Sequence, residues 1–439
     1  MTLCTGLRPF PHFEARKLRT RLKLFQEFGV TSLRMPGVAA LLALSMAGSP
    51  LRGQDTTAAA ADTEYVEYRE SPISLPLLFG LRIPTYDRVN GLTLPWGPKL
   101  ELGEGKLDVD GLVRYRSNLG KWDPSLEGII RSGGSSELRF FGGIGTFTND
   151  AWIRSDLTNS ATALFAGADT RNHYRANRAN ARFATTLTRP SFSLTPFIEG
   201  NFERDWSTGS LAPTKSPWSF YGRKGNLRMR RPNPRVANGN ITSILGGTGV
   251  QVVRGGLDGK LDATLEKSLH TSLKPDCAGV TTGGLCPQPL PGESFAQATL
   301  DSRVSFPTFG TQTFAFVGHA VLTGGAGIAP AQRFAYLGGN GTLATVNLLA
   351  LGGDHLVFVS GDYKIPIDRI QIRFLGNPFI AVTYAAGNAG IDSVPALIQN
   401  VGVGAGVGLV RVDYSIDPAH NRSPFSRRSA LTFGVSLSP

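Results

Sequence analysis

The chain has 439 residues, of which 41% are hydrophobic and 18% charged, and a formal net charge of +12. Its charged fraction is below the ~25% of an ordinary soluble domain, and no apolar run reaches the ~18 residues of a membrane-spanning helix. These values exclude a bundle of membrane-spanning helices. Eight Arg or Lys and two Glu lie in residues 1–54, so this segment holds half of the net charge. The modest remainder gives no reason to expect nucleic-acid binding.

Residues 1–54 have the pattern of an export leader. A basic stretch, Arg16 to Lys23, precedes the short apolar segment 38–47, which ends in the small-x-small sequence Ser45-Met46-Ala47. This order is typical of a signal peptide, and cleavage near Gln54 fits as well. Because the basic stretch is long, Met35 is an alternative start. The other interpretation is a buried helix of a cytoplasmic protein. We expect residues 55–88 to form a short periplasmic segment.

From residue 89 to 439 the dominant sequence period is two. Leu261 and Leu265, for example, alternate with Asp262 and Glu266. One apolar and one charged face, repeated in segments near the ~9–11 residues that cross a bilayer, is the pattern of an outer-membrane barrel. A soluble β-sandwich also alternates, but with shorter strands. The sequence therefore predicts an all-β fold, a transmembrane antiparallel β-barrel.

Fourteen segments carry the strand pattern, and 12 to 16 strands fit the chain. They are 91–103, 106–117, 122–132, 135–147, 177–189, 191–206, 240–253, 257–270, 294–306, 310–322, 353–367, 369–385, 399–416 and 427–438. Within 399–416 the apolar face changes phase, which implies a bulge or a second short strand. Long connections at 148–176, 207–239, 271–293 and 323–352, opposite short turns, are the outer-membrane arrangement.

The segment 332–367 resembles the C-terminal barrel of the outer-membrane assembly and surface-antigen superfamily (BamA-type barrels). The motif residues are Leu337, Gly338, Gly339, Gly341, Thr342 and Leu343, followed in the next strand by Asp362, Tyr363, Lys364 and Pro366. In that family the first motif opens a long loop that folds back into the lumen. The match covers about 330–439, and 85–92 resembles the first strand of some relatives. The resemblance implies an inward-folded loop here too.

Two departures from the family pattern affect the expected function. Where relatives carry Arg after Gly-Thr-Leu and dock it on an acidic site, this chain has Ala344, Thr345 and Val346. We therefore expect the loop to be held by apolar and backbone contacts, against the glycine face of 399–409. Only about 35 residues separate Gln54 from the first strand, fewer than the ~50 of a small domain. Periplasmic domains would then have to come from a separate chain.

Two further features suggest sites outside the strands. Cys277 and Cys286 flank a short Gly-rich loop in an exported chain, which predicts a disulfide; a metal site would need further ligands nearby. A second stretch, 221–236, carries six basic residues and no acid: Arg223, Lys224, Arg228, Arg230, Arg231 and Arg235. Its functional interpretation is a patch for lipopolysaccharide phosphates. Its other interpretation is a solvated loop.

Three functions fit these observations. The first is an envelope component of the cell outer membrane, a surface-antigen-type barrel that acts as a pore for small solutes or lipid. The second is a protein assembly or translocation barrel that works with a separately encoded periplasmic partner. The third is a barrel enzyme acting on lipid. The six histidines show no metal-ligand spacing and no evident Ser/His/acid set. We therefore expect no catalytic residues, no metal and no cofactor.

Overall fold

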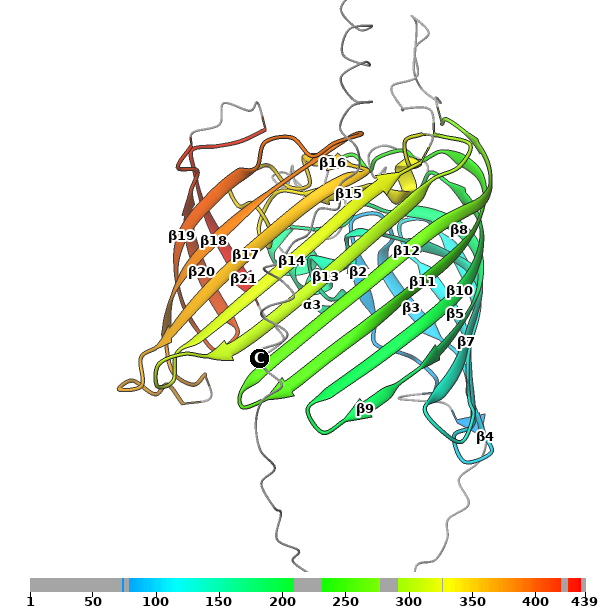
Figure 1. Ribbon diagram of the computed structural model, residues 1–439, viewed down its shortest axis with the longest axis horizontal. Helices are drawn as coiled ribbons and strands as arrows, with labels where there is room; N and C mark the ends of the chain where they lie inside the picture. Colours follow the sequence, from blue (N-terminus) through cyan, green and yellow to red (C-terminus); the bar gives the residue numbers. More distant parts are fainter. Residues whose placement is uncertain are drawn as a thin grey trace, which may run out of the picture. The chain divides into compact units, whose positions relative to one another are not determined.

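The computed structural model describes residues 73–74, 79–208, 231–276, 291–325, 327–373, 375–419 and 425–435. The chain divides into two units, 1–69 and 70–439, and the structure below is that of the second. Its long strands form one 19-stranded antiparallel sheet that curves round into a barrel (Figure 1). Among the described residues no helix is long and apolar enough to cross a membrane. The predicted all-β antiparallel fold is confirmed.

The strands are long and follow one another along the chain. They are β1 (Ile73–Ser74), β2 (Thr85–Asp87), β3 (Gly91–Trp96), β4 (Lys99–Leu102), β5 (Leu107–Arg116), β6 (Lys121–Arg131), β7 (Ser136–Phe147), β8 (Tyr174–Thr185), β9 (Leu187–Arg189), β10 (Phe192–Trp206), β11 (Asn238–Arg254), β12 (Leu257–Lys274), β13 (Ala296–Pro307), β14 (Thr313–Gly324), β17 (His355–Pro366), β18 (Phe379–Gly390), β19 (Ile398–Val407), β20 (Val410–Ile416) and β21 (Ser429–Val435). The sheet thus includes residues that precede position 89.

From β5 onward each long strand pairs with the next long strand in the sequence. β3 and β4 both pair with β5, so together they form one strand with an interruption. β8 and β9 both pair with β10 and form another interrupted strand. Counting β3 with β4 and β8 with β9 as one strand each leaves 17 strands, including the two-residue β1, so the number lies at or just above the upper limit of the expected 12 to 16. The phase change in 399–416 is a hairpin: Val407 pairs with Val410 across a turn in which Gly408 has φ +57°. The second short strand is thus the correct alternative for this segment.

The two ends of the sheet are not paired with each other in the part of the chain that the structure describes. β21 pairs with β20 alone, and β2 pairs with β3 alone. Hydrogen-bonded closure of the predicted barrel is therefore absent from these ranges. The helix α3 (Asp156–Ala166) lies beside both β2 and β21, so an element inside the barrel faces both edges.

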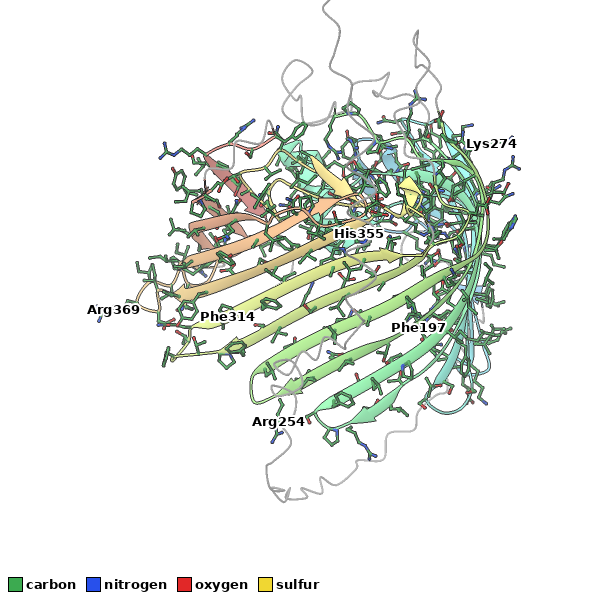
Figure 2. All side chains as sticks on the ribbon, turned by 45° about the horizontal axis from the view of Figure 1, so that its top comes forward. Phe197, Arg254, Lys274, Phe314, His355 and Arg369 are labelled. Atoms are coloured by element: carbon green, nitrogen blue, oxygen red, sulfur yellow. The ribbon has the colours of Figure 1, made fainter. Side chains whose placement is uncertain are left out.

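The two faces of the strands differ as their sequence predicts. On β12, Leu265 and Leu269 are 56% and 65% exposed, whereas Glu266 and Ser268 are buried inside. The same alternation recurs around the sheet, so a band of apolar side chains points outward. Charged side chains such as Arg254, Lys274 and Arg369 lie at the ends of the strands (Figure 2). The band thus lies between two polar rims.

Two long connections on one rim fold into the barrel. The first, which we call the helical plug (148–173), contains the 3-10 helix η1 (Asp150–Trp152) and α3. Ser155 caps α3 by accepting a hydrogen bond from the Thr158 N–H, and Gly167 ends it with φ +58°. The second, the plug loop (327–354), contains η2 (Ala331–Arg333), β15 (Ala335–Leu337) and β16 (Leu351–Gly353). Both lie within the curve of the sheet (Figure 1).

Candidate functional site: the plugged lumen

The plug loop folds inward through the motif that the sequence singled out. Leu337 and Leu343 are fully buried and pack, with Val346, against wall residues that include Leu356 and Phe358. The motif glycines are required by the backbone: Gly338, Gly339 and Gly341 have φ values of +121°, +87° and +104°. A Cβ on Gly338 would also lie 2.1 Å from the Asn347 carbonyl oxygen. The inward-folded loop is thus confirmed, with apolar side chains at its centre.

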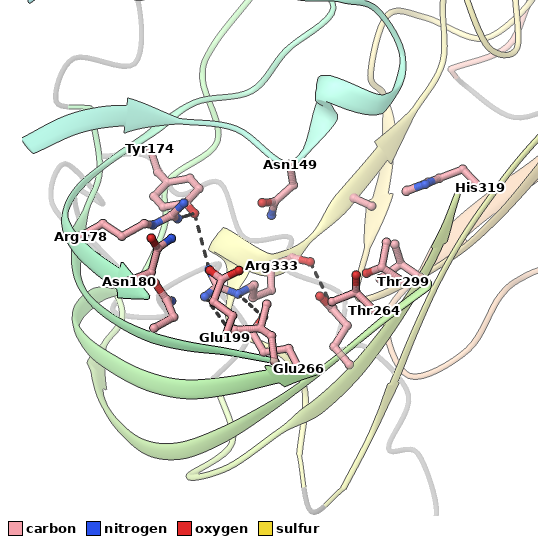
Figure 3. A pocket seen from close by; sticks show the side chains of 15 residues that line it. Asn149, Tyr174, Arg178, Asn180, Glu199, Thr264, Glu266, Thr299, His319 and Arg333 are labelled. Carbon is pink, nitrogen blue, oxygen red and sulfur yellow. Dashed lines mark hydrogen bonds and ion pairs between the residues drawn. The ribbon is translucent and has the colours of Figure 1, made fainter. Parts of the chain in front are cut away.

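The plug loop is also anchored by a buried arginine, which the sequence analysis did not foresee. Arg333 donates from Nε and Nη2 to the two oxygens of Glu266, at 2.8 and 2.9 Å (Figure 3). It also forms an ion pair with Glu203. Burial alone would lower the pKa of Arg333, but the two carboxylates raise it well above its ordinary value. The expectation that only apolar and backbone contacts hold the loop is therefore wrong. The arginine comes from the start of the loop, not from the position after Leu343.

A second polar junction fastens the helical plug near the end of β2. Arg88 is 1% exposed, and its Nη1 lies 3.0 Å from Asp169 Oδ2. Its Nη2 donates to the side chains of Asn172 and Asn233, both at 3.2 Å. Burial would raise the pKa of Asp169, but His173 and Arg88 hold it well below its usual range. Arg88 thereby links β2 to the helical plug and to the segment that precedes β11.

The fold brings together one group with metal-ligand chemistry, Asp87, Asp169 and His173, whose ligand atoms lie within 4.8 Å of one another. Protein donors already occupy both carboxylates: Asp169 Oδ2 accepts from Arg88, and Asp87 Oδ1 accepts from two backbone N–H groups. The guanidinium also supplies the positive charge that a metal would bring. The group therefore fits an ion-paired junction better than a cation site. Sequence spacing gave no signal for it.

The two plugs divide the lumen into separate cavities. One of about 290 Å³ is lined by Arg178, Glu199, Glu266 and His319 (Figure 3). Another of about 460 Å³ lies between β2, β5 and β7. A third, of about 1070 Å³, lies between α3, the plug loop and β21. Charged side chains line part of the first two, among them Arg178 and Glu199 in one and Arg114 and Glu127 in the other, as expected of a barrel interior.

The four motif residues of the strand after the loop contribute to the wall and not to the plug contacts. Asp362 pairs with Arg411 of β20, Lys364 lies over the Phe379 ring at 4.2 Å, Tyr363 accepts a hydrogen bond from Thr308, and Pro366 ends β17. Lys364 thus contacts the neighbouring strand β18, whereas Asp362 reaches across β18 and β19 to Arg411. These contacts connect β17 to the wall around it.

The plug loop meets the strand expected to form its wall, but at a different residue. The Thr345 N–H donates to Asn400 Oδ1 at 3.0 Å, and Asn400 Nδ2 donates to Thr345 Oγ1 at 2.8 Å. The glycine face lies further along β19 and is covered by the neighbouring strand. A Cβ on Gly404 would lie 2.1 Å from Asp413 Oδ1. These glycines thus make room for wall side chains.

The remaining sequence-predicted sites are partly outside the described residues. Cys277, Cys286, Arg223, Lys224, Arg228 and Arg230 all lie there. Arg231 points inward and donates to the Asn172 side chain and to the carbonyl oxygen of Arg171, and Arg235 pairs with Asp276 at 3.1 Å. The disulfide and the surface patch stay predictions.

No family model matches the chain, and no curated protein matches it in sequence. Among solved structures it is similar to CdiB from Escherichia coli (TM-score 0.43, 11% identity, 83% of this chain and 62% of that one) and to CdiB from Acinetobacter baumannii (0.42, 10%, 80% and 58%). It is also similar to the copper transporter OprC (0.30, 9%, 80% and 65%). The chain spans less than two thirds of the length of each. The function proposed below is therefore derived from the residues of this chain.

Proposed function

We propose that the chain is an outer-membrane β-barrel of the surface-antigen type. The apolar band on its outer face supports this: Ile198 and Phe202 on β10, and Leu265 and Leu269 on β12, are all at least half exposed. Soluble proteins rarely expose a continuous apolar surface of this kind, whereas a bilayer requires one. The long connections then lie on the outer side and the short turns on the periplasmic side.

The proposed activity is that of a plugged conduit for small solutes or lipid, without catalysis or a cofactor. The observation that carries it is the buried anchor of the plug loop, Arg333 between Glu203 and Glu266. A charged contact of this kind costs desolvation and is not needed merely to fill a barrel, since apolar residues would do so. It gives the plug loop one defined closed position, from which a single displacement opens the lumen.

The unpaired edge of β21 favours a second candidate, protein assembly or translocation with a separately encoded periplasmic partner. Its backbone is not bonded to β2 or β3 within the described ranges, and the Phe433 carbonyl accepts instead from Asn340 of the plug loop. A free strand edge can add a strand from another polypeptide. Depletion of the chain should then lower the abundance of other barrel proteins, which a solute pore would not do.

The conduit proposal is tested by deleting residues 337–349 and measuring conductance in planar bilayers. The deletion removes Leu337 and Leu343 from the lumen but keeps the anchor at Arg333 and all long strands. We expect low, rarely opening conductance for the intact chain and a large, persistent conductance for the deletion. A correctly folded deletion variant with the conductance of the intact chain would contradict the proposal.

A further inference from the structure

The cavity between α3, the plug loop and β21 has an unusual lining. About 1070 Å³ in volume, it is bounded by three arginines, Arg154, Arg231 and Arg427, and by no acidic residue among those that the structure describes. Its other walls are apolar or neutral side chains from α3, the plug loop and β21. Elsewhere in the lumen arginines are matched with carboxylates, as at Arg333 and Arg88. This cavity differs because positive charge gathers in it without a matching acid.

These three arginines form no ion pair in the ranges that the structure describes. Arg154 donates to the backbone carbonyl of Asn340 at 3.2 Å, and burial lowers its pKa. Arg231 donates to carbonyl and amide oxygens, and its buried Nε has no hydrogen-bond partner. Burial, followed by repulsion from Arg88, lowers the pKa of Arg231 to about 9. Asp169 and Asp150 oppose this lowering, but neither forms a direct ion pair with Arg231. A buried guanidinium without a direct ion pair favours the binding of an anion.

The cavity continues from the lumen to the outer face of the barrel. Its lining includes both the inward residues Ala430 and Thr432 of β21 and the outward residues Leu431 and Phe433. Leu431 and Phe433 are 61% and 65% exposed. Both faces of one strand can border a single space only where that strand is an edge, as β21 is in the described residues. An occupant could therefore contact the arginines and the apolar outer surface at once.

We propose that this cavity binds the phosphate-bearing headgroup of an anionic membrane lipid, with the lipid chains lying along Leu431 and Phe433. Guanidinium groups match phosphate oxygens in charge and fork geometry. The volume lies at the upper end of ordinary ligand pockets, roughly 300–1,000 Å³, so it holds a headgroup and leaves the chains outside. The plug loop borders the cavity at residues 344–348, and a bound lipid would stabilise the closed plug. This inference rests on the proposed membrane location.

The test uses the full chain purified in a neutral detergent and titrated with phosphatidylglycerol, phosphatidylcholine or inorganic phosphate. Bound molecules are counted by native mass spectrometry. We expect phosphatidylglycerol to bind at about one per chain, and phosphatidylcholine and inorganic phosphate to bind much more weakly. Arg427→Gln and Arg154→Gln should each weaken binding roughly 10- to 100-fold, the effect of losing a charge-assisted hydrogen bond. Arg427 is exposed, so its variant should fold even if Arg154→Gln does not.

Arg139→Gln is the matched control, because Arg139 is a rim arginine paired with Glu137 and does not line the cavity. It should leave lipid binding unchanged. Equal binding of phosphatidylglycerol and phosphatidylcholine would overturn the proposed site. So would a loss of lipid affinity in Arg139→Gln as large as that in Arg427→Gln and Arg154→Gln. Competition by inorganic phosphate at the same concentration as the lipid would overturn the lipid as its ligand. A chain that does not insert into vesicles at all would contradict the membrane location itself.

Discussion

The anchor of the plug loop gives the sharpest quantitative prediction. Arg333→Met keeps an unbranched apolar stem but removes the charge, and leaves Glu266 buried without its partner, whereas Glu203 keeps its ion pair with Arg178. Breaking a buried ion pair from one side costs about 3–5 kcal/mol. Since 1.4 kcal/mol is a tenfold change in an equilibrium constant, the ratio of open to closed plug should rise roughly 100- to 4,000-fold.

Planar-bilayer recordings measure this change directly. Arg333→Lys, which keeps the charge but not the bidentate contact with Glu266, should fall between wild type and Arg333→Met. Adding Glu266→Gln to Arg333→Met should recover part of the closed state, because the carboxylate left without a partner is then neutral while Glu203 stays paired with Arg178. Arg189→Gln, on the exposed strand β9, is the control. A folded Arg333→Met barrel with wild-type open probability would refute the anchor.

Three further predictions concern other parts of the molecule. Burial raises the pKa of Asp150 to about 7. Between about pH 4 and pH 7 the carboxyl group is therefore protonated in the folded state and ionised in the unfolded state, so the stability of the helical plug should fall as the pH rises through this range. Hydrogen exchange of the helical plug measures this stability, and Asp150→Asn should remove its pH dependence. The same pH profile in Asp150→Asn and wild type would contradict the role of Asp150. Leu265→Arg should lower the free energy of unfolding in lipid vesicles by about 2–4 kcal/mol, and Asp262→Asn should lower it far less. Equal losses in the two variants would contradict the assignment of outer and inner faces. Cys277 and Cys286 should resist alkylation until reduced, and free labelling of both would exclude the disulfide.

The strands could be predicted because their signal is local. Alternation along 257–270 was sufficient to place β12 and both of its faces, since neighbouring residues in a strand point to opposite sides. The same rule gave a wrong boundary for the strand predicted at 369–385, because β18 begins only at Phe379. Ile370 and Ile372 alternate with polar residues there, yet they lie half exposed in the turn after β17. Period-two patterns do not distinguish a strand from an apolar turn beside it.

The plug contacts could not be predicted because they join residues far apart in the chain. Arg333, Glu203 and Glu266 each look like ordinary polar residues in their own segments, and only the strand order brings them together. The helix α3 is a different case. Ser155 before it and Gly167 after it are standard helix boundary residues, so local sequence contained a signal within a segment that was expected to be a long loop.

The central claim is that this chain spans the outer membrane as a barrel. Cell fractionation combined with electrophoresis of unheated and heated samples tests it most directly. The account predicts that the protein sediments with the outer membrane, needs detergent for extraction, and migrates differently before and after boiling, because an intact barrel resists unfolding in mild detergent. Recovery of the folded protein from the soluble periplasmic fraction, with the same mobility in both samples, would contradict the account.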